Sequence, residues 1–154
     1  MNLLLAQNLA NELILEHKLK NWTFRYDHAR RRFGSCNFSK KEITLSKILT
    51  ELNSPPAVRQ TLIHEIAHAL AGPRAAHGEK WKTIVLKLGG EPARCYSHTE
   101  IQLPPAKYTA RCPHCEKKFP ALRRKQKVAC RSCCKEFNRG RYSAKFLLEF
   151  VEAW

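Results

Sequence analysis

Apolar residues recur every three or four positions in four segments of the chain, which is the spacing of one face of an α-helix. The clearest case is the start of the chain, where Leu5, Leu9 and Leu13 follow one another at intervals of four. Phe146 and Phe150 repeat this interval near the C-terminus. The pattern predicts helices at residues 2–20, 55–70, about 78–88 and about 143–153.

Strands are predicted where large apolar and polar residues alternate. Residues 22–26 and 42–46 have this alternation, and residues 30–36 pass through a turn into another short strand. Ser54 and Pro55 are typical of a helix start, and Gly72 followed by Pro73 is typical of a helix end. Helices and a small sheet in this order indicate an α+β fold.

A proline pair after Leu103 divides the chain into a larger N-terminal and a smaller C-terminal part. We therefore expect a core domain over residues 1–103, a cysteine-rich segment over 108–138 and a closing helix over 143–154. No apolar run approaches the ~18 residues that a membrane span needs. The first residues lack a basic segment and a cleavage site, so we expect an amphipathic helix there, not a signal peptide.

The predicted helix at 55–70 carries two histidines with an acidic residue between them. His64 and His68 lie four apart, so both imidazoles project from one face of the helix and can chelate a single Zn²⁺. Glu65 is rotated by ~100° from His64 and therefore lies beside the metal, where a carboxylate can act as a general base on water. The spacing predicts a catalytic zinc centre.

A catalytic zinc takes three protein ligands, so a third must come from elsewhere in the chain. His77 follows the turn at Gly72, which allows the chain to double back, and it is the ligand that we favour. Three other residues stay open as alternatives on spacing alone. They are Glu79, His98 and Glu100.

Seven cysteines are present, and four of them form two Cys-x-x-Cys pairs separated by 14 residues. This pattern predicts a closed structural zinc site, the centre of a zinc ribbon. Its predicted ligands are Cys112, Cys115, Cys130 and Cys133. Cys134 competes with Cys133, and His114 is an alternative to Cys115.

Positive charge is concentrated in the C-terminal third. The chain has 28 Lys and Arg against 13 Asp and Glu, and residues 108–154 contribute 12 basic and 4 acidic side chains. Such a density indicates a polyanion partner, and we expect binding to DNA without sequence preference. The predicted contacts are Arg123, Arg124, Lys125 and Lys127, placed on the hairpin of the ribbon, together with Arg30, Arg31 and Arg32.

His64-Glu65-x-x-His68, a short loop and then His77-Gly78-x-x-Trp81 resemble the SprT-like zinc metalloprotease family of bacterial SprT and eukaryotic Spartan. Phe33-Gly34-Ser35-Cys36 and the later cysteine pairs also resemble that family, so the likeness spans about residues 5–138. The resemblance implies a zincin-like metallopeptidase core, with a zinc held by the three histidines and with Glu65 as the base. It also implies proteolysis of DNA-bound or DNA-crosslinked proteins.

We therefore expect a zinc-dependent endopeptidase with two zinc ions, one catalytic and one structural, acting as a monomer on protein substrates near DNA. We expect it in the cytoplasm, at the nucleoid in a bacterium or in the nucleus of a eukaryote. The alternative is a nucleic-acid-binding zinc-ribbon protein whose protease centre is vestigial or regulatory. The presence of Glu65 argues against that alternative, because a purely structural metal site needs no base.

Overall fold

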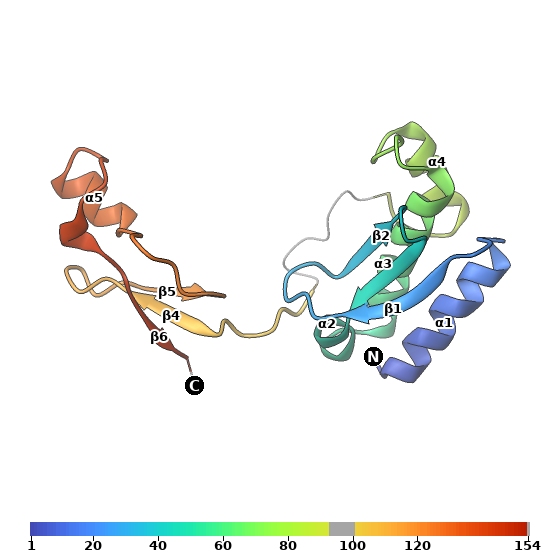
Figure 1. Cartoon of the computed structure of the whole chain (residues 1–154), viewed down its shortest axis with the longest axis horizontal. Helices are drawn as coiled ribbons and strands as arrows, with labels where there is room; N and C mark the ends of the chain where they lie inside the picture. The colour runs from blue at the N-terminus through green and yellow to red at the C-terminus, as the bar shows by residue number, and fades with distance from the viewer. Residues whose placement is uncertain (93–100, 154) are drawn as a thin grey trace. The chain divides into compact units, whose positions relative to one another are not determined.

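The computed structural model describes residues 1–92 and 101–153, which form two compact units. The first unit is Met1–Pro104 and the second is Pro105–Trp154. Figure 1 shows the first with α1, α2, α3, α4 and a sheet of β1, β2 and β3, and the second with β4, β5, β6 and α5. His98, Glu100 and Cys95 lie outside the described residues. No helix in the described part is long and apolar enough to cross a membrane.

The first unit packs its helices on one face of a three-stranded sheet. Its strands are β1 (Thr23–Asp27), β2 (Gly34–Asn37) and β3 (Glu42–Ser46), in the order β1-β3-β2. β3 runs parallel to β1 and antiparallel to β2. The strands at 22–26 and 42–46 are thus confirmed, within one residue at each end.

Alternation along these strands separates an apolar face from a polar face. Ile43 and Leu45 are fully buried against the helices. On the other face, Asp27 accepts hydrogen bonds from the Thr44 hydroxyl (3.0 Å) and from Arg32 (2.6 Å). Thr44 in turn contacts the hydroxyl of Ser35 at 2.7 Å. The apolar face therefore anchors the helices, while the polar face is held together by side-chain hydrogen bonds.

The first helix is shorter than predicted, and Leu5 of its predicted apolar face lies outside the contact face. α1 spans Leu3–Glu16, and the chain turns at Lys18, which has a positive φ of 53°. Leu5 is 59% exposed, while Ala6 and Ala10 are fully buried with Leu13. Small side chains allow the helix to approach its neighbours closely, so the alanines, not Leu5, form the contact face.

Three further helices complete the first unit. α2 (Lys47–Leu52) was not predicted, and the Ser46 hydroxyl at its N-terminus accepts a hydrogen bond from Leu49 N–H. α3 (Pro55–Ala71) begins and ends where the sequence predicts, although the Ser54 side chain makes no capping hydrogen bond. α4 (Glu79–Lys87) matches the helix expected at 78–88. α3 carries the histidine motif into the centre of the unit.

The second unit is a small antiparallel sheet with one short helix. β4 (Tyr108–Arg111) lies between β5 (Lys118–Ala121) and β6 (Glu149–Glu152), and α5 covers Arg131–Phe137. The β4–β5 turn contains the first cysteine pair, and α5 carries the end of the second. Residues 123–127, which we expected on the hairpin, lie instead in the loop between β5 and α5. This charged stretch lacks the apolar alternation of a strand.

The predicted C-terminal helix is wrong. Ala144–Phe146 form a single 3₁₀ turn, and β6 follows. Phe150 pairs with Ala110 and Val151 with Thr109, so the segment completes the sheet of the second unit. An isolated two-stranded hairpin is only marginally stable in water, and so is an isolated helix of this length. Pairing with the open edge of β4 therefore overrides the local helical spacing.

Candidate metal centres

The three predicted histidines converge at one point. His64 and His68 lie one turn apart on α3, and His77 comes from the loop between α3 and α4. The Nε2 atoms are 3.3 Å apart between His64 and His68, and each is 3.1 Å from the Nε2 of His77. Four tetrahedral ligands at 2.0–2.1 Å from zinc lie about 3.3–3.4 Å from one another. The three nitrogens therefore fit one zinc ion.

The loop that returns His77 to α3 is held by backbone hydrogen bonds. Gly72 ends α3 with a φ of 92°, and its carbonyl accepts a hydrogen bond from Ala75 N–H at 3.2 Å. Gly78 N–H then donates to the Ala75 carbonyl at 2.9 Å. The ammonium of Lys80 donates to the carbonyl of Ala71 at 2.7 Å, at the C-terminus of α3. These contacts fold the loop back over the end of the helix.

Glu79, the alternative ligand within the described residues, points away from the group. Its side chain is 88% exposed and forms an ion pair with Lys82 at 2.7 Å. The other two alternatives, His98 and Glu100, are among the residues that the structure does not describe. Of the predicted third ligands that can be placed, His77 is the one that meets His64 and His68.

Burial keeps two of these imidazoles neutral. Burial, together with the charges that His68 and His77 would carry, lowers the pKa of His64 to about 4. Burial, with the charge of His77, likewise lowers the pKa of His68 to about 4. A neutral imidazole is the form that binds a metal ion. Both groups are therefore ready to act as ligands at neutral pH.

Glu65 lies beside the histidines in a cavity of about 360 Å³. Its side chain is almost fully enclosed, with 8% of the residue exposed. Burial raises the pKa of Glu65 to about 7, and the charge of Arg32 opposes part of that shift. A carboxyl group with a pKa near neutral can both accept and return a proton. The cavity is lined by Ser35, Cys36, Phe38, His64, Glu65, His68, Gly72, Pro73, Ala76 and His77.

Sequence reasoning missed two neighbours of this cavity. Gly34 in β2 packs directly against Glu65, because a Cβ at this position would lie 2.9 Å from Glu65 Cγ. Cys36, two residues further on, is half-buried and lines the cavity. Burial, with the charge of Glu65, raises the pKa of Cys36 to about 12. The strand next to the helix thus forms one wall of the site.

The four predicted cysteines form a second group in the smaller unit. All four Sγ atoms lie within 4.8 Å of one another, with Cys112 and Cys133 at 3.8 Å and Cys115 and Cys130 at 3.7 Å. Thiolates at 2.3 Å from a tetrahedral zinc are about 3.8 Å apart, so the group also fits zinc. Cys134 is buried but outside the group. The structure therefore selects Cys133 over its neighbour.

His114 stands next to this group without belonging to it. Its Nδ1 is 3.6 Å from the Sγ of Cys133, and its ring packs edge-on against Phe137 and Phe146. A backbone hydrogen bond from Cys133 lowers the pKa of Cys130 to about 7, while burial raises the pKa of Cys133. The four sulfur atoms, without His114, therefore make up the candidate ligand set.

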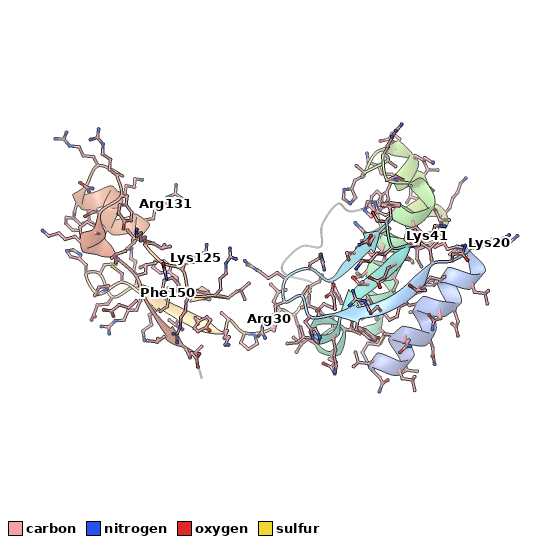
Figure 2. All side chains as sticks on the ribbon, viewed as in Figure 1. Lys20, Arg30, Lys41, Lys125, Arg131 and Phe150 are labelled. Carbon is pink, nitrogen blue, oxygen red and sulfur yellow. The ribbon has the colours of Figure 1, made fainter. Side chains whose placement is uncertain are left out.

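The predicted DNA contacts lie in both units. Arg123, Lys125 and Lys127 are exposed in the loop after β5, and Arg124 lies 5.1 Å from the Tyr108 ring and 3.7 Å from Glu152. Figure 2 shows Lys125 and Arg131 on the second unit, with their side chains projecting from the ribbon. In the first unit, Arg31 is exposed, Arg32 pairs with Asp27, and Arg30 follows β1.

Comparison with known proteins places this geometry in a family. Residues 5–103 match the model of the SprT-like family. Protein SprT of Glaesserella parasuis is 29% identical over 123 residues, which cover 72% of this chain and 78% of that protein. Protein SprT of Pseudomonas fluorescens is 32% identical over 115 residues, 65% of this chain and 69% of its own length. The zymogen of the metallopeptidase jannalysin from Methanocaldococcus jannaschii aligns with a TM-score of 0.48 and 17% identity, covering 62% of this chain and 85% of its own.

Proposed function

This chain belongs to the SprT-like family, and we propose that it is a zinc-dependent endopeptidase with its active site at His64, His68, His77 and Glu65. The observation that carries the proposal is the meeting of three Nε2 atoms within 3.3 Å of one another beside a buried carboxyl group. A structural metal site would need the ligands but not the carboxyl group. The combination favours an enzyme over a vestigial centre.

The chemistry divides between the metal and Glu65. A zinc ion held by the three histidines would polarise the scissile carbonyl and activate the attacking water. Glu65 takes a proton from that water and delivers it to the nitrogen of the leaving amine. Its enclosure in the cavity suits this role, because burial raises its pKa to about 7 and so makes it a stronger base than an exposed carboxylate.

The edge of β2 supports an extended polypeptide as the substrate. Ser46 N–H donates to the carbonyl of Phe33 at 2.7 Å. In an antiparallel pair every second residue forms the main-chain hydrogen bonds, so the backbone groups of Ser35 also point toward β3. The backbone groups of Gly34 and Cys36 then point to the opposite edge, with which no strand pairs among the described residues. An extended chain can add to such an edge by main-chain hydrogen bonds, next to the histidines.

Replacement of the base tests the activity directly. Glu65→Gln keeps the size of the side chain but cannot accept a proton, so cleavage of an unstructured protein should fall by about 10²–10⁴-fold. The zinc content and the thermal unfolding of the variant should match those of the unchanged protein. His77→Ala should instead lose zinc together with cleavage. Full activity in Glu65→Gln would show that the chemistry lies elsewhere.

We also propose that the enzyme acts on proteins bound or crosslinked to DNA, because its smaller unit carries a large excess of positive charge. Residues 108–154 have a net charge of +8, and all four basic residues of the loop after β5 are exposed. Lysine and arginine side chains contact phosphates without reading sequence. Binding to DNA would raise the local concentration of substrate, so that selectivity would follow from proximity.

The salt dependence of binding locates the DNA contacts. Each phosphate contact that is lost should reduce the slope of log affinity against log salt by about one unit. We expect this reduction when the four loop residues Arg123, Arg124, Lys125 and Lys127 are replaced by Gln. A charge-matched control replaces four exposed lysines of the first unit, Lys18, Lys20, Lys40 and Lys41.

The outcome separates three possibilities. A smaller slope in the loop variant alone supports contacts on the ribbon. An unchanged slope there, with a smaller slope after replacement of Arg30, Arg31 and Arg32, moves the contacts to the first unit. Equal slopes in all variants, or no binding by the unchanged protein, would remove DNA from the proposal and leave the peptidase activity untouched.

A further inference from the structure

Trp81 is fully buried, yet its indole ring contacts all three histidines of the candidate metal centre. The centroid of the indole lies 4.7 Å from that of His64, 5.3 Å from His68 and 4.6 Å from His77. The ring stacks on His68 at an angle of 30° and meets His77 edge-on at 89°. One side chain therefore forms a common surface under three ligands.

These contacts join separate segments of the chain. Trp81 belongs to α4, while His64 and His68 belong to α3 and His77 to the loop between them. The indole N–H also reaches toward the carbonyl of His64 at 3.4 Å. Because the indole spans both helices, a shift of α4 would move its contacts with every ligand.

The usual support of metal-binding histidines is a hydrogen bond from the second ring nitrogen to a carboxylate or carbonyl. In the described part of the chain, neither His64 nor His68 has a side-chain hydrogen-bond partner other than the neighbouring histidines. Besides the contacts among the histidines themselves, both rings pack against the indole of Trp81. Aromatic pairs at such distances have preferred angles, so the packing can fix ring orientation.

We propose that Trp81 is the positioning residue of the histidine metal centre, and that it sets the zinc affinity by orienting all three imidazoles. This inference rests on the proposed function, since it assumes that the histidines bind zinc. Trp81 does not line the cavity that holds Glu65, and its effect passes through the ligands. In the sequence Trp81 is part of the motif that begins at His77, but its contacts with the three histidines are seen only in the fold.

The test is the zinc affinity of the full chain, measured by competition with a chromophoric chelator. His77→Ala identifies the part of the binding that belongs to the histidine centre. Trp81→Leu should weaken that part by about 10- to 100-fold, as loss of an outer partner of a metal ligand does. Trp81→Phe keeps one aromatic ring and should lose less zinc affinity than Trp81→Leu. The visible spectrum of bound Co²⁺ should change in the same order, because it reports ligand geometry.

Val85→Ala is the matched control. Val85 is buried in the same apolar cluster and lies one turn further along α4, but it makes no ring contact with the histidines. Its truncation should lower the unfolding temperature while zinc affinity and the Co²⁺ spectrum stay unchanged. If Trp81→Leu does not fold, Trp81→Phe against Val85→Ala gives the same comparison.

Two failures can be told apart. If the unchanged protein binds no zinc that His77→Ala removes, the metal centre itself is wrong, and the inference falls with it. If the unchanged protein binds that zinc and the Trp81 variants bind it equally well, only the role of Trp81 is overturned. Equal losses of affinity in the Trp81 and Val85 variants would also overturn it, since the effect would then follow stability.

Discussion

Gly34→Ala should disturb the general base without touching the metal ligands. An added Cβ would lie 2.8 Å from Thr61 Cγ2, 2.9 Å from Glu65 Cγ and 3.0 Å from Glu65 Oε1. Ordinary contacts between such atoms are about 3.5–4.0 Å, so the overlap is roughly 0.5–1 Å. Gly34 does not have a positive φ, so alanine brings no backbone strain and the effect is purely steric.

The magnitude follows from this overlap. Overpacking of a dense core costs about 1–3 kcal/mol of unfolding free energy. If the strand stays in place, Glu65 must move instead, and a displacement of about 1 Å can cost on the order of 10²-fold in rate. We therefore expect kcat to fall by one to two orders of magnitude while both zinc ions are retained.

Gly90→Ala provides the matched control. A Cβ there would lie 2.6 Å from Ile63 Cγ2 and 3.0 Å from Val85 Cγ1, so it overpacks the same unit without reaching Glu65. Cleavage of an unstructured substrate, zinc content and thermal unfolding are measured for both variants. The reasoning is refuted if folded Gly34→Ala keeps its kcat, or if Gly90→Ala loses as much kcat at the same loss of stability.

Three further results are expected. Cys112→Ser should reduce zinc from two ions per chain to one, as measured by elemental analysis. It should also make residues 105–154 sensitive to limited proteolysis, because the cysteines form the core of that unit. Asp27→Asn should cost about 1–3 kcal/mol of unfolding free energy at pH 7, measured by urea denaturation, since charged hydrogen bonds are lost. Burial raises the pKa of Asp27, but hydrogen bonds from Ala29 N–H, Arg32 and Thr44 outweigh that effect and leave the pKa lowered. The stability that Asp27 contributes should therefore be present above pH ~4 and be lost as the pH falls further. In acid, the difference in unfolding free energy between the unchanged protein and Asp27→Asn should disappear.

Local features of the sequence were enough to predict the helix that carries His64, Glu65 and His68. Proline at the first helical position and glycine after the last one act through local backbone geometry alone, and α3 spans Pro55–Ala71 as these two signals predict. The interval between His64 and His68 places both rings on one face in any α-helix. The two Cys-x-x-Cys pairs predict a four-sulfur group in the same way, because the short spacing brings the two sulfur atoms of each pair close together.

The sequence favoured His77 and Cys133 but left alternatives open, and the tertiary structure shows why these two residues join their groups. His77 meets the other histidines because the chain reverses at Gly72, and Cys133 joins the sulfur group in place of Cys134 because of its direction in α5. Trp81 and Gly34 belong to the motifs that resemble the SprT-like family, but the sequence does not show what either residue contacts. Their contacts with the site arise where α4 and β2 pack against α3.

Where the predictions were wrong, a partner distant in sequence changed the local preference. The segment at 149–152 has helical spacing, yet it pairs with β4, which offers a free edge. The contact face of α1 includes Ala6 and Ala10 together with Leu13, while Leu5 is exposed, because the small alanines let the helix approach the core closely. Local sequence determines backbone turns and the spacing of ligands along one element. Long-range pairing and packing determine which elements meet, because their free energy is gained only when surfaces far apart in the chain are brought together.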